Sequence, residues 1–310
     1  MRTEAATAAP PAGAFRPAPD NPRLGILLMV VSTVLFAGLW TLVKVLAERY
    51  PIAEVSFFRS LLALIPVSAM IAAHGGLRLL RPHSLSGHVW RSVIGVTSMF
   101  LGFLSYHLMP LADAVAISFT SPLMITALSV PLLGEKVGKL RWGAVIVGFF
   151  GVLIIVHPSG SVFNMGALSA IGGAVTSAFA MITIRQLNRT DPPLTIVFYF
   201  TFFSSILTAL PLPFVWVTPD ASDWLLMAGM GLTGGFGQYF MTRAYGLASA
   251  AVISPLNYVS LLWASLFGWV LWGDIPASHV FTGSVIVIAS GLFILYREGR
   301  KNKETKTNKS

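Results

Sequence analysis

Ten apolar runs of roughly 18 to 24 residues, separated by short polar joints, dominate this chain of 310 residues. A helix rises 1.5 Å per residue, so each run can cross about 30 Å of hydrocarbon. Hydrophobic residues make up 55% of the chain and charged residues only 11%, a composition unlike that of a soluble domain. The sequence therefore predicts an all-α membrane protein with ten transmembrane helices, near residues 24–46, 52–73, 87–108, 112–133, 140–157, 165–185, 193–217, 222–246, 249–272 and 278–296.

Lysine and arginine collect on one side of the predicted membrane, and this bias indicates the orientation. With the N-terminus inside, the inner segments hold nearly all the basic residues, and the outer ends hold only Lys44 and Arg49. We therefore expect a multi-pass protein of the cell inner membrane with two cytoplasmic tails, a disordered one at residues 1–23 and a basic, solvated and disordered one at residues 297–310. The lipid bilayer then accounts for the net charge of +9 without a nucleic-acid partner.

The two halves of the chain resemble each other. Residues 106–137 align with 245–276 at a shift of 139, and a shift of 141 places Pro51 over Pro192. This pattern predicts that helices 1 to 5, residues 24–157, are repeated as helices 6 to 10, residues 165–296. Because five is odd, the second repeat enters the membrane in the opposite orientation. Transporters with inverted repeats hold their substrate near the midplane, between the repeats.

Four segments carry a resemblance to a known family: WTLVK, the FFR of the second run, GEKVGKLRWGAVIVGFFGVLII and RAYGLASAAVISPLNYVSLLWASLFGWVLWGD. Together they resemble the EamA-type drug/metabolite transporter superfamily over nearly all of residues 24–296. The resemblance implies a ten-helix inner-membrane carrier with a central cavity and alternating access. Members of this family move amino acids and their derivatives, nucleosides, vitamins or toxic compounds. Asp274 stands where a glutamate is more usual, and the carboxylate is retained.

The sequence holds no motif of an enzyme, an ATP-driven pump or a metal site, and we expect no cofactor. GEKVGKL lacks both the glycine spacing of a phosphate loop and the Ser or Thr after its lysine. Acidic residues such as Glu54 and Asp113 lie at helix ends or in loops, so we expect facilitated or exchange transport over carboxylate-coupled proton antiport. His107 is the intramembrane group expected to titrate near neutral pH, although interfacial hydrogen bonding is its more ordinary role.

Arg59 lies about seven residues into the second run, roughly 10 Å below the outer boundary. A lipid-facing arginine at depth costs on the order of 3 kcal/mol, so Arg59 needs an explanation. It aligns with Phe200 and has no cationic counterpart in the second repeat. It therefore contacts a substrate carboxylate or phosphate, pairs with Glu54 or a helix end, or snorkels to the interface. Small and polar residues within one turn of it favour a helix-facing side: Ser56, Ser60 and Ala63.

Polar and aromatic side chains at helical spacing supply the other cavity candidates. Gln238 and Asn257 form the best pair for recognising an amide or a carboxylate, although hydrogen bonds between helices are the commoner use of such groups. Pro122 and Pro255 each remove a helix hydrogen bond, and they serve either as gating bends or as passive kinks. The predicted substrate contacts are Trp40, Arg59, Tyr106, Ser118, Gln238, Asn257 and Tyr258.

These patterns predict a secondary transporter that moves a small amphipathic metabolite by alternating access. Export of amino acids or amino-acid-derived zwitterions is the first candidate. The alternatives are import of a vitamin or nucleoside-like cofactor, such as riboflavin or S-adenosylmethionine, and, from another class, a non-transporting membrane scaffold. The GxxxG at Gly231 to Gly235 permits close helix packing, either inside the chain or at a homodimer surface.

Overall fold

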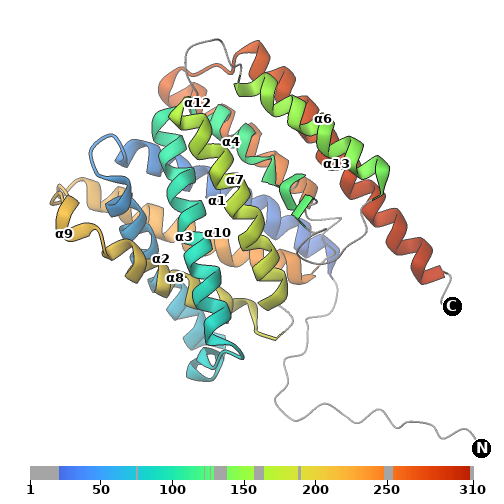
Figure 1. The fold of residues 1–310 in the computed structure, drawn as a ribbon. Coiled ribbons are helices and arrows are strands. Elements are labelled where there is room, and N and C mark those ends of the chain that lie inside the picture. Colours follow the sequence, from blue (N-terminus) through green and yellow to red (C-terminus); the bar gives the residue numbers. More distant parts are fainter. Residues whose placement is uncertain are drawn as a thin grey trace, which may run out of the picture.

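The computed structural model describes residues 21–74, 76–121, 123–125, 127–128, 138–156, 164–187, 190–247 and 254–307, and these ranges contain helices and no strands (Figure 1). The helices are α1 (Pro22–Leu46), α2 (Ile52–His74), η1 (Gly76–Leu80), α3 (Leu85–Leu108), α4 (Leu111–Ser118), α6 (Lys139–Val156), α7 (Met165–Leu187), α8 (Pro193–Ala209), α9 (Leu212–Val215), α10 (Asp223–Leu247), η2 (Ser254–Tyr258), α12 (Val259–Trp272) and α13 (Ser278–Thr307).

Four of the described helices, α1, α2, α3 and α7, are long and apolar enough to cross a membrane on their own. Shorter apolar helices follow the predicted runs at α4, α6, α8, α12 and α13. The remaining run is α10, a helix of 25 residues in which glycines and a polar stripe interrupt the apolar side chains. Each predicted run therefore has its helix, as expected for an all-α membrane protein.

The helices pack in the pairs that an internal two-fold relation requires. α1 packs along α10, and α3 packs along α7, which is the same pair after the two repeats are exchanged. α2 packs on α8, α4 on α12, and α6 on α13, so each of these helices meets its own repeat counterpart. Figure 1 shows α6 and α13 lying side by side along one edge. The fold is thus two five-helix repeats around a pseudo-two-fold axis, as in inverted-repeat transporters.

Glycines let several of these helix pairs approach closely. A Cβ at Gly151 of α6 would lie 2.9 Å from the carbonyl oxygen of Gly283 in α13. In α10, a Cβ at Gly235 would lie 2.8 Å from the Pro66 ring of α2. The GxxxG of α10 therefore packs against α2 within the chain, and a homodimer surface remains a prediction.

Some helix boundaries differ from those the sequence predicts. The seventh run was expected to be helical over 193–217, but α8 ends at Ala209 and Pro211 starts the short α9, because a proline cannot continue the hydrogen-bond ladder. The ninth run was expected to be helical over 249–272. Residues 249–253 lie outside the described residues, the next five form the 3₁₀ turn η2, and α12 starts at Val259. α13 continues to Thr307, so the described part of the basic tail is helical where disorder was predicted.

The end of α12 ties the second repeat to the first. Gly273 has φ 70°, a left-handed conformation that favours glycine, and its N–H donates to the carbonyl of Trp269. Asp274 follows and accepts a hydrogen bond from Lys44 Nζ of α1 at 3.2 Å. Lys44 also lies 4.7 Å from the centroid of the Trp272 ring. These contacts give Lys44 an architectural role at the joint between the two repeats.

A polar cluster at one end of the bundle, the Asp223 latch, joins the α1–α2 turn to the start of α10. Arg49 Nη1 forms an ion pair with Asp223 Oδ1 at 3.0 Å, and the Tyr50 hydroxyl donates to Asp223 Oδ2 at 2.7 Å. The backbone N–H of Asp220 donates to the Tyr50 hydroxyl. Asp223 is buried, so these bonds satisfy a carboxylate that would otherwise lose its hydration.

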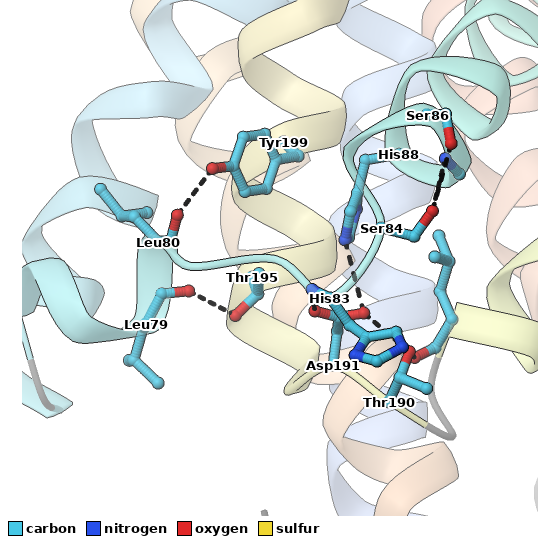
Figure 2. Close-up of polar contacts among 12 residues, drawn as sticks. Leu79, Leu80, His83, Ser84, Ser86, His88, Thr190, Asp191, Thr195 and Tyr199 are labelled. Atoms are coloured by element: carbon cyan, nitrogen blue, oxygen red, sulfur yellow. Dashed lines mark hydrogen bonds and ion pairs between the residues drawn. The ribbon is translucent and has the colours of Figure 1, made fainter.

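A second cluster at the opposite end, the Asp191 latch, joins the α7–α8 turn to the start of α3 (Figure 2). The backbone N–H of His83 donates to Asp191 Oδ1 at 2.8 Å, and the Thr190 hydroxyl donates to Asp191 Oδ2 at 2.8 Å. His88 Nε2 lies 3.7 Å from the same Oδ2. Both the His88 and the Asp191 side chains are buried.

Two hydroxyl groups of α8 extend the Asp191 latch to η1. Thr195 donates to the carbonyl of Leu79, and Tyr199 donates to the carbonyl of Leu80, each at 2.7 Å (Figure 2). The last carbonyl groups of a helix have no hydrogen-bond donor within the helix, and these two hydroxyl groups supply donors at the end of η1. The latch therefore fastens the second repeat to the loop between the second and third helices of the first.

Replacing Gly151 with alanine should lower the free energy of unfolding by about 1–3 kcal/mol, because the added methyl group would push α6 away from α13. Gly143→Ala on the same helix is the matched control, since nothing lies within 4 Å of a Cβ there. Thermal unfolding in detergent measures both. Equal melting temperatures for the two variants would show that the Gly151–Gly283 approach does not hold the helices together.

Tyr50→Phe should destabilise the protein by about 1–3 kcal/mol, because the buried Asp223 carboxylate and the Asp220 N–H would each lose a partner. Tyr296→Phe, on an exposed face of α13, is the control and should leave the melting temperature unchanged. If the two variants melt alike, the Asp223 latch contributes little to stability.

Candidate functional site

Two buried arginines from different helices contact one aromatic ring. Arg59 of α2 and Arg91 of α3 are each only 4% exposed. The Cζ atom of Arg59 lies 5.5 Å from the centroid of the Phe200 ring in α8, and that of Arg91 lies 3.7 Å from it. Cation–π contacts of this kind stabilise a guanidinium more strongly when water is excluded. We call these three residues the arginine pair and its ring.

Within the described residues, the arginine pair has no counter-ion. The ion pairs there involve other residues, and Nε and Nη1 of both arginines are buried without a hydrogen-bond partner. The two Cζ atoms are no more than about 9 Å apart, the sum of their distances to the shared ring. Two cations this close in a dry interior repel each other, so the site favours an anion.

The ring also marks where the site lies in the fold. Phe200 is the repeat counterpart of Arg59, and the two side chains are in contact. A residue that touches its own counterpart must lie close to the pseudo-two-fold axis, at the interface of the repeats. Substrates of inverted-repeat transporters bind at this interface, near the bilayer midplane.

Two glycines provide the room that the guanidinium groups occupy. A Cβ at Gly234 of α10 would lie 3.2 Å from Arg59 Nε. A Cβ at Gly95, one turn after Arg91 on α3, would overlap Arg91 Nη1 and would lie 2.8 Å from the Phe200 ring. The guanidinium groups therefore pack directly against the main chain of α10 and α3, because glycine has no side chain at these two positions.

Buried hydroxyl groups lie on α2 and α8, the helices that carry Arg59 and the Phe200 ring. The Oγ atoms of Ser56 and Ser60 in α2 and of Ser204 in α8 are buried without a hydrogen-bond partner. Ser60 adjoins Arg59 in the chain, and Ser204 follows Phe200 by one turn. A ligand with carboxylate oxygens can accept hydrogen bonds from such hydroxyls and from both guanidinium groups.

The structure excludes two of the alternatives for Arg59, and contact with a substrate remains a prediction. The predicted pair with Glu54 is wrong, because Glu54 Oε2 accepts a hydrogen bond from the backbone N–H of Val217. Snorkelling is also wrong, because the side chain is buried between helices. The small residues within one turn of Arg59 are buried at helix contacts, as predicted: Ser56, Ser60 and Ala63.

Sequence reasoning missed two buried basic residues of α3, Arg91 and His88. Arg91 was counted as part of an inner basic segment, but α3 starts at Leu85 and places it about two turns inside the helix. His107, the histidine that the sequence singled out, has an exposed side chain near the end of α3, and its predicted role is untested; His88 is the buried histidine of α3. The signal was the spacing of His88, Arg91 and Gly95, which share one helix face.

A second group of predicted residues comes together between α1, α3 and α4. The rings of Trp40 and Tyr106 lie 5.8 Å apart. The Ser118 hydroxyl donates to the carbonyl of Ala114 and also interacts with the side chain of Tyr106. This apolar surface with a polar edge suits an amphipathic molecule, and a substrate contact there remains a prediction.

The predicted pair of Gln238 and Asn257 is separated. Asn257 Nδ2 donates to the hydroxyl of Tyr245 at 3.0 Å, and Tyr245 lies seven residues after Gln238, roughly 10 Å further along α10. Tyr258 packs edge to face on Phe119, with its hydroxyl against the α13 backbone at Gly291. Roles for these residues in substrate binding remain predictions.

The two predicted gating prolines are only partly described. Pro255 lies in the 3₁₀ turn η2, just before α12, where the main chain departs from an α-helix. Pro122 lies outside the described residues. A gating role for either proline remains a prediction.

The sequence matches the EamA-like transporter family twice, over residues 23–157 and 164–296. The chain belongs to the EamA-like transporter family. The double match agrees with the repeated helix pairs, and it establishes ten transmembrane helices in two inverted five-helix repeats. This EamA-like protein is a membrane transporter of small molecules, and it is neither an enzyme nor the non-transporting scaffold considered above.

Similar proteins of known function are metabolite transporters. The chain is 28% identical to the pseudopaline exporter of Pseudomonas aeruginosa, over 87% of this chain and 95% of the exporter. It is 29% identical to the riboflavin transporter of Vibrio cholerae, over 91% and 96% of the two chains. It is 29% identical to the S-adenosylmethionine uptake transporter of Rickettsia prowazekii, over 82% and 86%. A solved crystal structure covers 89% of this chain with a TM-score of 0.65 at 19% identity, which supports the fold alone.

Arg91→Met should raise the melting temperature of the unliganded EamA-like protein, because it removes a buried cation without a counter-ion and keeps an apolar side chain on Phe200. Arg78→Met, at an exposed position in η1, is the control and should have little effect. Thermal unfolding without added ligand makes the comparison. A clear drop for Arg91→Met alone would show that Arg91 is a structural residue with a partner.

Proposed function

We propose that this EamA-like protein exports a small metabolite that carries one or more carboxylates, with amino acids and amino-acid-derived zwitterions as the first candidates. The carrier works by alternating access in the cell inner membrane, with repeats at residues 24–157 and 165–296. The distribution of basic residues supports cytoplasmic termini. In that orientation the Asp191 latch faces the cytoplasm and the Asp223 latch faces outward.

The arginine pair carries this proposal. Two cations without a described counter-ion, buried beside the pseudo-two-fold axis, are unfavourable when the site is empty and favourable when an anion binds. A carboxylate accepts paired N–H bonds from a guanidinium, and a ligand with two carboxylates can contact both arginines. Helix packing does not require this arrangement, because the repeat counterpart of Arg91 is the buried Met230.

The aromatic surface of Trp40 and Tyr106 supports an amphipathic substrate whose apolar part lies against the rings. Gln238 is buried on α10, the helix that also carries Gly234 beside Arg59, and it is a further candidate for the polar end. The similarity to an exporter of pseudopaline favours export among the transport directions.

The second candidate is import of a vitamin or nucleoside-like cofactor, because two similar proteins transport riboflavin and S-adenosylmethionine. The arginine pair discriminates between these compounds. S-adenosylmethionine carries one carboxylate but also a sulfonium and an ammonium group, so its net charge is positive and two buried guanidinium groups would disfavour it relative to a neutral or acidic zwitterion. Riboflavin has no carboxylate and would leave the arginines without a counter-ion.

Thermal stabilisation of the purified protein tests the proposal against a panel of acidic and neutral amino acids, carboxylated zwitterionic derivatives, S-adenosylmethionine and riboflavin. We expect a carboxylated compound to raise the melting temperature of the wild type. Arg59→Gln and Arg91→Gln should each weaken that response at least tenfold in half-saturating concentration, which corresponds to about 1.4 kcal/mol. Arg78→Gln, at an exposed position, should respond like the wild type.

Stabilisation by riboflavin that is equal in the wild type and both arginine variants would favour the second candidate. A carboxylated ligand that stabilises all variants equally would place the recognition group elsewhere, first at Gln238 and Asn257.

A further inference from the structure

The His88 side chain is fully buried in a position that leaves its ring nitrogens unsatisfied. It is 0% exposed, and neither Nδ1 nor Nε2 has a hydrogen-bond partner. The closest acidic atom is Asp191 Oδ2, 3.7 Å from Nε2 and beyond hydrogen-bonding range (Figure 2). The ring instead packs against Tyr199, with 5.0 Å between centroids. A histidine held in this way is poised to change its contacts when it changes charge.

The Asp191 latch and the Asp223 latch are repeat counterparts at opposite ends of the carrier. Asp191 and Tyr50 occupy equivalent positions, each directly before the aligned prolines that precede α8 and α2. The Asp191 latch joins the α7–α8 turn of the second repeat to the start of α3, the third helix of the first repeat. The Asp223 latch joins the α1–α2 turn of the first repeat to the start of α10, the third helix of the second repeat. A carrier that alternates access must open one such contact at a time. The two latches are therefore placed as the gates.

The chemistry of the two latches differs in one respect. In the Asp223 latch the carboxylate pairs with Arg49, whose guanidinium stays charged at any physiological pH. In the Asp191 latch the corresponding partner is an imidazole, which titrates near pH 6.5 in water. The repeat counterpart of His88 is Met227, so helix packing does not require a histidine at this position. Of the two latches, the Asp191 latch thus has the buried group whose charge a proton changes near neutral pH.

The groups around His88 determine which charge the closed latch tolerates. Asp191 faces it from the α7–α8 turn, Tyr199 faces it from α8, and Arg91 follows one turn later on α3. The only other described histidine of this loop, His83, is exposed and contributes its backbone N–H to Asp191. An imidazolium here would lose its hydration and lie one turn from buried Arg91. Asp191 does not offset this cost, because its oxygens lie beyond hydrogen-bonding range of the ring and already accept hydrogen bonds from His83 and Thr190, so the closed latch favours a neutral imidazole.

We propose that the Asp191 latch is one gate of this carrier and that His88 is its proton-binding site, so that proton uptake by His88 opens the gate. Protonation adds a proton from water to the free imidazole nitrogen and gives an imidazolium that must be hydrated. Hydration separates η1 and the start of α3 from α8. When the proton returns to water, the neutral ring packs again on Tyr199 and the gate closes.

This inference rests on the transporter family and the latch geometry, and it does not depend on which substrate the arginine pair binds. It provides proton coupling without the mid-helix carboxylate that the sequence lacks. In the proposed orientation, a proton that arrives from outside opens the cytoplasmic gate and leaves to the cytoplasm.

Spin-label distance measurements on the full chain test the gate directly. The protein has no cysteine, so Leu77→Cys in η1 and Gln186→Cys near the end of α7 give two exposed labelling sites on either side of the latch. We expect one short distance at about pH 8 and a second, longer distance that gains several-fold in population at about pH 5.5. His88→Gln and His88→Met, the latter taken from the repeat counterpart, should keep the short distance at both pH values. His83→Gln is the matched control and should respond like the wild type.

A wild-type distance distribution that is the same at both pH values would overturn the inference. So would a pH response that persists in both His88 variants, or one that His83→Gln abolishes, since the proton would then bind elsewhere. Loss of substrate stabilisation by the panel, with the pH response intact, would contradict the proposed substrate class and leave the gate unaffected.

Discussion

The central constraint on this EamA-like transporter is the repulsion between two buried arginines that share one aromatic ring. Arg59 and Arg91 approach the Phe200 ring from α2 and α3, and Gly234 and Gly95 leave the space that their guanidinium groups fill. Such an arrangement costs stability in the empty carrier and lowers its energy when an anion arrives. The pair lies at the repeat interface, where inverted-repeat transporters bind their substrates, and this position motivates the proposed anion site.

The two-fold relation between the repeats explains most of the fold, and its exceptions mark the candidate sites. Helix pairing follows the relation throughout the described helices, and both latches occupy equivalent positions. The exceptions are three basic residues of the first repeat. Phe200, Met227 and Met230 stand where the first repeat has Arg59, His88 and Arg91. Apolar residues suffice for packing at these positions, so the charged residues need a different explanation.

The fold could be predicted from the sequence because membrane insertion leaves few alternatives. Apolar runs of spanning length must be helices in lipid, and the aligned halves fix how the helices pair. Helix boundaries were less accurate where prolines intervene, as at Pro211, whereas the predicted end of the ninth run at residue 272 matches the end of α12 before Gly273. The candidate site was harder to predict. Arg59 stood out against its apolar neighbours, but Arg91 followed polar residues at the start of a helix, and only packing shows that both reach the same ring.

A structure of the carrier with its substrate bound would test the central claim most directly. The account predicts substrate carboxylate oxygens within hydrogen-bonding distance of the guanidinium groups of both Arg59 and Arg91, beside the Phe200 ring. A substrate that lies elsewhere, for example between Trp40 and Gln238, while both guanidinium groups remain in contact with the ring and with no anion, would contradict it.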